Sequence, residues 1–287
     1  DGYQFRATAD HPVLCENKEF REVGALSVGD RVALHPGGMF AENPALVSYS
    51  PIPFVTASIT ADEDFGLFLG FYMGDGSFNE AQLSIACDAK DVDVVSRVRS
   101  LVHRFVGPSY VRETGLRKGC CEVRVSRVAL VEPFRALGII RSNTGPYKRL
   151  VCVPDIIKRS PFPVVAAFLR GLFEADGFVS ATGGVIIFST KDERFAVEVQ
   201  LLLLQFGITC RRALGMSHLN GQKFPQHRLS LRKAECELFA QRIGFVSAIK
   251  NQRLAQVRKP HKRDNVVTFA DTVARIVPRG IERVYDI

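Results

Sequence analysis

The chain lacks the patterns that mark several classes of protein. No apolar run approaches the ~18 residues needed to cross a membrane, because Gln205 interrupts the longest compact run at 201–204. We therefore expect no membrane partner. The first ten residues, DGYQFRATAD, contain no apolar signal region, so secretion is not supported. They also lack a Met, which suggests a processed, excised or trimmed chain.

Paired cysteines and metal-ligand spacings are also missing. The 7 Cys form no C-x-x-C pair, and the 6 His are scattered along the chain. A disulfide scaffold or a zinc ribbon is therefore a poor interpretation, and reduced thiols in a cytoplasmic protein are the default expectation. Tryptophan is absent too, which excludes no class of protein.

What is present is typical of a globular protein. The 287 residues are 46% hydrophobic and 24% charged, which excludes disorder as the main state and allows about two domains. The 38 Lys and Arg outnumber the 30 Asp and Glu, which leaves a net charge of +8. A positive charge hints at an acidic partner such as nucleic acid, although many enzymes are equally basic.

The two ends of the chain are rich in strand signals. Residues 1–35 contain alternating apolar positions and a turn at 28–30, and 265–287 hold strand-like stretches around a Pro-Arg-Gly turn. Between 36 and 61 the chain is rich in Pro, Gly and Ser, which predicts a linker or an extended crossing segment. We therefore expect a β-module that is interrupted by an inserted domain.

The middle of the chain, 62–257, contains an internal repeat. FLGFYMGDGSF at 68–78 matches FLRGLFEADGF at 168–178, and similar patterns follow each copy. The order in each half, about 62–150 and 151–257, is roughly α-β-β-α-β-β-α. A period of this length is too long for a solenoid, so it predicts two pseudo-symmetric halves of one α+β domain.

The first copy of the repeat predicts an unusual helix. Asp62 or Asp64 is a suitable N-cap for an apolar helix that carries Gly66, Gly70 and Gly74 at four-residue spacing. Glycine costs ~1 kcal/mol in a helix interior, so three on one face favour the close approach of another backbone. We therefore expect the two repeated helices to form the interface between the halves.

Both repeated helices end in an Asp-Gly dipeptide. If the helices pack side by side, Asp75 and Asp176 meet at one end of the interface. Two neighbouring carboxylates repel each other unless a cation binds, so a hard divalent ion such as Mg²⁺ is expected there. Metal ions beside a phosphodiester can activate water and stabilise the leaving 3′ oxygen. An ordinary helix-end turn is the alternative for either Asp-Gly taken alone.

These two segments resemble the motifs of LAGLIDADG homing endonucleases. The resemblance implies a helical interface, β-sheets that straddle double-stranded DNA, and divalent metal at the acidic residue that ends each motif. It assigns metal to Asp75 and Asp176, together with the preceding Gly74 and Ala175. Mg²⁺ is the expected ion, and Mn²⁺ or Ca²⁺ can occupy the same site. Glu174 is interpreted as incidental.

The family also places a basic residue, usually Lys, near each active centre. The segment IGFVSAIKNQRL at 243–254 resembles the stretch after the second half, which makes Lys250 the catalytic candidate there. In the first half the corresponding place, three residues before Pro154, is Val151. Lys148 is the basic residue that we assign to this role. A solvated lysine is the alternative at both positions.

Three segments of the strand-rich ends resemble the Hint splicing module of inteins. They are TADHPVL at 8–14, LSVGDRV at 26–32 and VYDI at 284–287. The resemblance implies that Thr8 and His11 activate a scissile N-terminal peptide bond, and an imidazole is a suitable proton donor to the departing amide nitrogen. The family's first Cys or Ser and its terminal His-Asn are absent, so we expect no splicing by this chain alone.

Basic residues on the predicted strands suit a DNA-facing surface. Alternate residues of a strand face one side, where Arg reads guanine edges and Lys binds phosphates. A solvated strand face is the alternative for each residue singly. The DNA-binding candidates are Arg112, Arg117, Lys118, Arg124, Arg211, Arg212, Lys223, His227, Arg228 and Arg232.

The sequence therefore predicts a LAGLIDADG endonuclease inserted in a partial all-β Hint-like module. We expect a cytoplasmic monomer that cuts both strands of a long asymmetric DNA site, with the exteins of a host protein as partners in the precursor. Two alternatives stay open. One is a DNA-binding module of the maturase type or an inactive endonuclease, and the other is an element whose main role is protein splicing.

Overall fold

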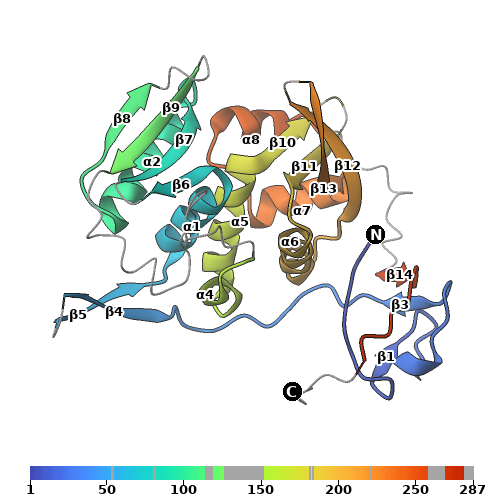
Figure 1. Cartoon of the computed structure of the whole chain (residues 1–287). Coiled ribbons are helices and arrows are strands. Elements are labelled where there is room, and N and C mark those ends of the chain that lie inside the picture. Colours follow the sequence, from blue (N-terminus) through green and yellow to red (C-terminus); the bar gives the residue numbers. More distant parts are fainter. Residues whose placement is uncertain are drawn as a thin grey trace.

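Two apolar helices lie at the centre of the molecule, between two four-stranded sheets (Figure 1). The computed structural model describes residues 1–52, 55–79, 82–113, 119–125, 152–180, 182, 184–219, 221–257 and 269–280. The central helices are α1 (Glu63–Asp75) and α5 (Phe162–Asp176), and the short α4 (Asp155–Lys158) precedes α5. Asp62 is the N-cap of α1, because its carboxylate accepts a 3.0 Å hydrogen bond from the Phe65 N–H.

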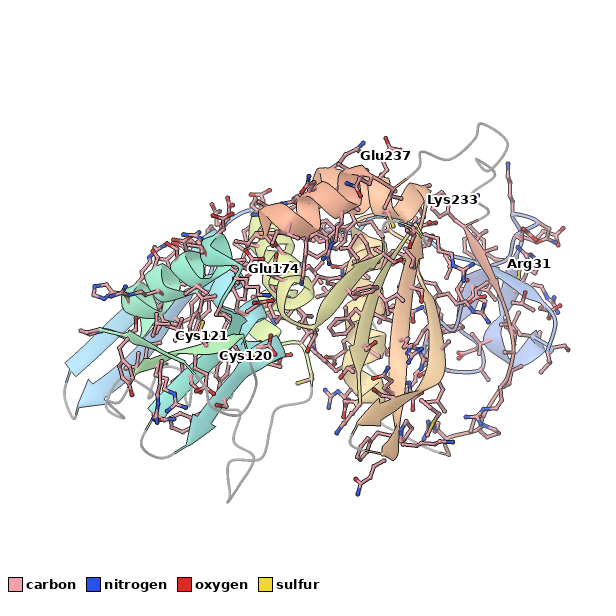
Figure 2. The ribbon with its side chains drawn as sticks, turned by 90° about the horizontal axis from the view of Figure 1, so that it is seen from above. Arg31, Cys120, Cys121, Glu174, Lys233 and Glu237 are labelled. Atoms are coloured by element: carbon pink, nitrogen blue, oxygen red, sulfur yellow. The ribbon has the colours of Figure 1, made fainter. Side chains whose placement is uncertain are left out.

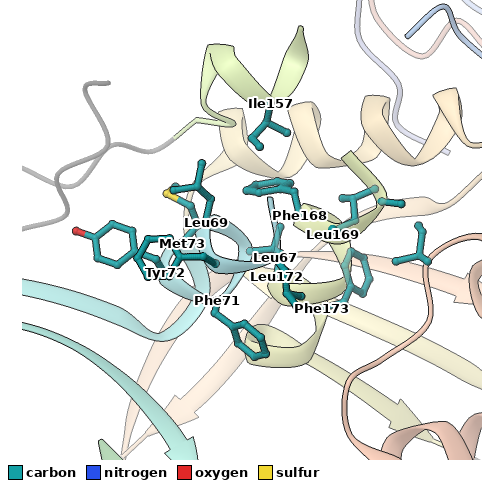
Figure 3. Packing of buried hydrophobic residues seen from close by; sticks show 14 of the residues in the cluster. Leu67, Leu69, Phe71, Tyr72, Met73, Ile157, Phe168, Leu169, Leu172 and Phe173 are labelled. Atoms are coloured by element: carbon teal, nitrogen blue, oxygen red, sulfur yellow. The ribbon is translucent and has the colours of Figure 1, made fainter. Parts of the chain in front are cut away.

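The central helices touch through their backbones, as the glycine spacing predicts. A Cβ on Gly70 would lie 2.7 Å from the Leu172 nitrogen, and a Cβ on Gly171 would lie 2.8 Å from the Phe71 nitrogen. No side chain fits at such distances, so glycine is required on both helices. On either side of this contact, the apolar side chains of α1 and α5 are buried (Figure 3).

Each central helix leads into an antiparallel sheet, and the two sheets have the same strand order. The first half contains β6 (Gly76–Asn79), β7 (Gln82–Asp88), α2 (Val92–Phe105), β8 (Tyr110–Glu113) and β9 (Cys120–Val125), in the order β6-β7-β9-β8. The second contains β10 (Gly177–Ser180), β11 (Val185–Thr190), α6 (Glu193–Gln205), β12 (Arg211–Leu219), β13 (Gln222–Arg232) and α7 (Ala234–Arg242), in the order β10-β11-β13-β12. The equal order confirms the predicted repeat. The last helix of the predicted order in the first half, at 127–137 in the sequence, lies outside the described residues.

The helix-to-strand transitions are direct in both halves. Gly76 and Gly177 have extended backbone conformations, with ψ of 148° and 144°, and each begins a strand. A Cβ on either glycine would overlap the carbonyl oxygen of Tyr72 or Phe173. The Asp-Gly pairs therefore join a central helix to the first strand of a sheet, and neither is an ordinary turn.

The two ends of the chain pair with each other. Strand β14 (Ala270–Thr272) runs antiparallel to β3 (Arg31–Ala33), and the Val273 N–H donates to the Asp30 carbonyl at 2.8 Å. Next to them, β1 (Pro12–Leu14) pairs with β2 (Phe20–Glu22). These strands form the small β-module of Figure 1, which both ends of the chain build together. The VYDI segment lies outside the described residues.

The stretch predicted to be a linker contains a pair of strands. β4 (Leu46–Ile52) and β5 (Val55–Thr60) are antiparallel, with Leu46 opposite Thr60. Their register shifts between Tyr49 and Ile52, where Pro51 has no N–H to donate. The linker interpretation is thus too simple for this stretch. Among the helices described, none is long and apolar enough to span a membrane.

Candidate active site

Asp75 and Asp176 end the two central helices at the same end of their interface. The preceding residues, Gly74 and Ala175, are in contact across it: a Cβ on Gly74 would overlap the Ala175 Cβ and lie 3.7 Å from the Asp176 nitrogen. Asp75 is exposed and Asp176 is half-buried. The structure therefore brings together the four residues that the repeat and the resemblance assigned to metal.

A hollow of about 650 Å³ opens beside Asp75. It reaches from the ends of β7 and β9 across the helix interface, and its lining consists of Asp75, Ala86, Cys87, Asp88, Lys90, Gly119, Cys120 and Ala175. Asp88 and Lys90 were not among the residues predicted from the sequence. The signal for both was their place at the end of a strand that begins only a few residues beyond the motif: Asp88 is the last residue of β7, and Lys90 follows two residues later. The β6–β7 hairpin returns the chain to the Asp75 end of the interface.

The donors in this region fit a hard divalent cation. Mg²⁺ prefers oxygen ligands, keeps several waters, and is usually held by one or two carboxylates together with substrate phosphates. No cluster of three or more His, Cys, Asp or Glu occurs in the described parts of the chain. Burial, assisted by the charges of Cys121 and Asp75, raises the pKa of the Cys87 thiol, which therefore stays protonated and a poor metal ligand. The carboxylates of Asp75 and Asp176 remain the suitable donors.

Lys250 lies at the carboxyl end of α5. It belongs to α8 (Ala248–Ala255). Ser247 is the N-cap of this helix, and its hydroxyl accepts a 3.2 Å hydrogen bond from the Lys250 backbone N–H. The Lys250 ammonium donates to the carbonyl oxygens of Gly177 at 3.0 Å and Phe173 at 3.4 Å, and to that of Glu174. Cations are favourable at a helix carboxyl end. Lys250 thus contacts the backbone on both sides of Asp176.

Glu174 is not incidental, so that interpretation was wrong. Its side chain is 3% exposed, and its Oε1 lies 3.2 Å from the Lys250 ammonium. Its Oε2 accepts hydrogen bonds from the backbone N–H groups of Val246 at 2.7 Å and Ser247 at 2.9 Å. Figure 2 shows Glu174 between the two sheets. A buried carboxylate with a charged partner and two N–H donors is a fixed structural element.

The register of the second sheet separates the predicted DNA-binding residues into two groups. Leu229 and Leu231 are fully buried, so the alternate residues Arg228 and Arg232 lie on the open face. Arg211 lies opposite Ser230 and shares this face. Lys223 is exposed near the tip of the β12–β13 hairpin.

Arg212 and His227 lie on the other face of this sheet, which corrects their assignment. Arg212 is opposite Leu229, and it donates to the Gly2 carbonyl at 2.9 Å and to Glu193 at 3.1 Å. His227 lies opposite the buried Thr190. Adjacent residues of a strand point to opposite faces, so the sequence pair Arg211-Arg212 has only one member on the open face.

The first sheet offers fewer described basic residues. Cys121 and Val123 are buried on β9, so Arg124 lies on the open face, together with Arg112 of the neighbouring strand β8. Arg124 donates to Glu122 at 2.5 Å, which neutralises part of its charge. The predicted residues Arg117, Lys118 and Lys148 lie outside the described residues.

Comparison with known proteins relates the second half to a family. Residues 163–244, from α5 to the end of α7, match the LAGLIDADG-like domain. The similarity to this family is therefore found in that segment of the second half. The matched region contains Glu174 and Asp176, and it ends just before the segment that carries Lys250.

Similar curated proteins have different names. DNA gyrase A of Mycobacterium gordonae is 27% identical over 263 residues, which cover 90% of this chain and 44% of that protein. DNA gyrase A of Mycolicibacterium flavescens is 29% identical, with 88% and 44% covered. The small component of replication factor C from Methanocaldococcus jannaschii is 23% identical, with 90% and 13% covered. The chain therefore spans less than half the length of these relatives.

Solved structures of similar shape include two kinds of protein. Mesophilic variants of the homing endonuclease I-DmoI have a TM-score of 0.46 and 15% identity, and the match covers 64% of this chain and 96% of theirs. Full-length DUF199/WhiA from Thermatoga maritima has a TM-score of 0.44 and 14% identity, with 76% and 67% covered.

Outside the LAGLIDADG-like half, Thr8 and His11 lie exposed in one turn of the β-module. The His11 N–H donates to the Thr8 carbonyl at 3.3 Å, and the His11 carbonyl accepts from Val23 at 3.0 Å, at the start of the short 3₁₀ helix Val23–Ala25. The turn predicted at 28–30 is present, since the Asp30 carboxylate accepts a 2.7 Å hydrogen bond from the Ser27 N–H. The splicing roles of Thr8 and His11 stay predictions.

Proposed function

We propose that this chain is a metal-dependent DNA endonuclease, carried as an insertion in a host protein, that cuts both strands of a long asymmetric site. The observation that carries the proposal is the meeting of Asp75 and Asp176. Backbone contact through Gly70 and Gly171 holds the two helix ends together, and each Asp leads directly into a sheet with an open face.

The chain's own residues have distinct tasks in this proposal. Asp75 and Asp176, with the backbone of Gly74 and Ala175, would hold the cation. A divalent ion there supplies charge stabilisation for the attacked phosphodiester and for the leaving 3′ oxygen. Lys250 places a positive charge beside Asp176, and Lys90 places one in the hollow beside Asp75. Positive charge at these places stabilises the transition state, in which the phosphoryl group gains negative charge.

Binding to double-stranded DNA is supported by the open faces of the two sheets. Arg112 and Arg124 are on the first sheet, and Arg211, Arg228 and Arg232 are on the second. Arginine side chains on a sheet can contact phosphates and read base edges. The two halves carry different residues at equivalent places. A single chain of this kind therefore acts as a monomer on a site that is not palindromic.

The insertion is supported by the relatives and by the β-module. A gyrase protein and a replication factor protein have different names, yet both match 90% of this chain with only 44% or 13% of their own length. A segment shared in this way is a module that different hosts contain. The pairing of β3 with β14 brings its two ends together, as an insertion requires. In this proposal, Thr8 and His11 serve Hint-type splicing from host exteins in the cytoplasm only within the full-length precursor, and this chain alone does not splice.

Cleavage of a plasmid that carries the uninterrupted host-gene sequence tests the enzymatic proposal. We expect a linear product with Mg²⁺, and none with chelator. Asp176→Asn should bind the same DNA with little change in affinity but lose cleavage by at least ~10³-fold, because the carboxylate that holds the cation is gone. Full cleavage by Asp176→Asn would overturn the assignment. Metal-dependent binding without cleavage by the unchanged protein would instead favour the maturase-like or inactive module.

A further inference from the structure

Glu174 and Lys250 form a largely buried charged pair near the proposed site. The Glu174 side chain is 3% exposed and that of Lys250 is 20% exposed. Both oxygens of Glu174 are used: one faces the Lys250 ammonium, and the other accepts from the N–H groups at the start of α8. Removal of one partner from such a pair is costly, because it leaves a charge without compensation in a poorly solvated place.

We propose that Glu174 is a positioning residue that holds Lys250 at the second active centre. This inference rests on the proposed function. Glu174 fixes the start of α8 through Val246 and Ser247, four and three residues before Lys250, and it fixes the ammonium directly. Lys250 is thus held at both its backbone and its charged end, and it is directed at the α5 carbonyls beside Asp176.

The first half has no carboxylate at the position equivalent to Glu174. The repeat places Met73 at the position equivalent to Glu174, two residues before Asp75. A thioether is at most a weak acceptor and carries no charge, so it cannot hold an ammonium and two N–H groups as a carboxylate does. The positioning by Glu174 therefore belongs to one centre, and its loss should slow the cutting of one DNA strand.

The first part of the test measures Lys250 without any DNA. The variants are Glu174→Gln, which keeps the shape, and Glu174→Met, which copies the first half. Glu237→Gln is the matched control, because Glu237 is exposed on α7 (Figure 2). Acetic anhydride acylates exposed lysines, and mass spectrometry measures the rate at Lys250 relative to that at the exposed Lys18. In the Glu174 variants we expect this relative rate to rise roughly tenfold, as for the loss of one charge-assisted hydrogen bond.

The second part follows each DNA strand separately. We expect the Glu174 variants to cut one strand roughly ten- to a hundredfold more slowly, so that nicked DNA accumulates, whereas Glu237→Gln cuts both strands at the normal rate. Lys250→Ala should slow the same strand, and Lys250→Ala combined with Glu174→Gln should add little to it. Thermal unfolding of each variant shows whether it is folded, and Glu174→Gln carries the test if Glu174→Met does not fold.

The outcomes separate the two proposals. Unchanged Lys250 acylation in a folded Glu174 variant would overturn the positioning role, and so would an equal slowing of both strands. If the unchanged protein cuts no DNA, the proposed function fails, while the acylation measurement still decides whether Glu174 holds Lys250.

Discussion

At the scale of single residues, neighbours in the sequence can have opposite surroundings. Arg211 and Arg212 are adjacent on β12, but only Arg211 is on the open face. The guanidinium of Arg212 is used within the protein, at the Gly2 carbonyl and Glu193. The basic composition of a strand therefore overstates the charge that it offers to DNA, and a pair of variants can measure the difference.

Arg211→Gln should weaken binding to target DNA and reduce the slope of log affinity against log salt by ~1, as expected for the loss of one phosphate contact. Arg212→Gln should leave that slope unchanged and lower the free energy of unfolding by about 1 kcal/mol, because its hydrogen bonds are internal. Fluorescence anisotropy over a salt series and urea unfolding provide the two measurements. Equal salt slopes for Arg211→Gln and the unchanged protein would remove Arg211 from the DNA surface.

At the scale of elements, the helix pair depends on the absence of side chains. Gly66, Gly70 and Gly171 face the backbone of the partner helix, with no room for a Cβ. In an isolated helix, exchanging Gly for Ala is favourable by ~1 kcal/mol. Helix propensity therefore favours Ala at these positions, whereas the close packing of the two helices requires Gly. The packing requirement is the stronger of the two.

Gly70→Ala should destabilise the protein by about 3 kcal/mol or more, since its Cβ would overlap the Phe168 carbonyl oxygen and force the helices apart. Gly221→Ala is the control: nothing lies within 4 Å of its added Cβ, and the cost of its φ of +78° is only about 1 kcal/mol. Urea unfolding compares the two. A Gly70→Ala protein as stable as the control would contradict the close helix contact.

Local signals predicted the helices well and the short strands poorly. The two repeated helices and Asp62, one of the two N-cap candidates, were predicted correctly, because these signals depend on residues close in sequence. The predicted order includes strands in the places of β6 and β10, but their residues were not located, because each strand begins directly after a helix with no intervening turn. The role of Glu174 was missed for another reason: its hydrogen-bond partners are 72 and 73 residues away in the sequence.

At the scale of the whole molecule, the chain consists of a repeated central part and a β-module built by both ends. The β-module is closed by the β3–β14 pair, which the Val273 N–H extends by one further hydrogen bond to Asp30. Most of the buried apolar side chains belong instead to the cluster around α1 and α5. The stability of the β-module should therefore depend on the β3–β14 pair more strongly than the stability of the central part does.

Val273→Pro should loosen the β-module and leave DNA cleavage within about twofold of the original rate. Proline cannot donate the hydrogen bond to Asp30, so the β3–β14 pair should open more often. Limited proteolysis should then cut faster within residues 1–35, while the fragment that contains α1 and α5 resists. A large loss of cleavage would show that the β-module supports the active site directly.

The direct passage from Asp75 to β6 and from Asp176 to β10 has a consequence for how such a protein could change its target. Each carboxylate is covalently next to the first strand of its sheet, and Gly76 and Gly177 admit no side chain that could loosen this joint. Substitutions on the open faces can therefore alter which bases are recognised without moving the point of attack. Under the proposed function, this joint fixes the distance along the DNA between the recognised bases and the bond that is cleaved. That distance stays the same while the recognised sequence diverges.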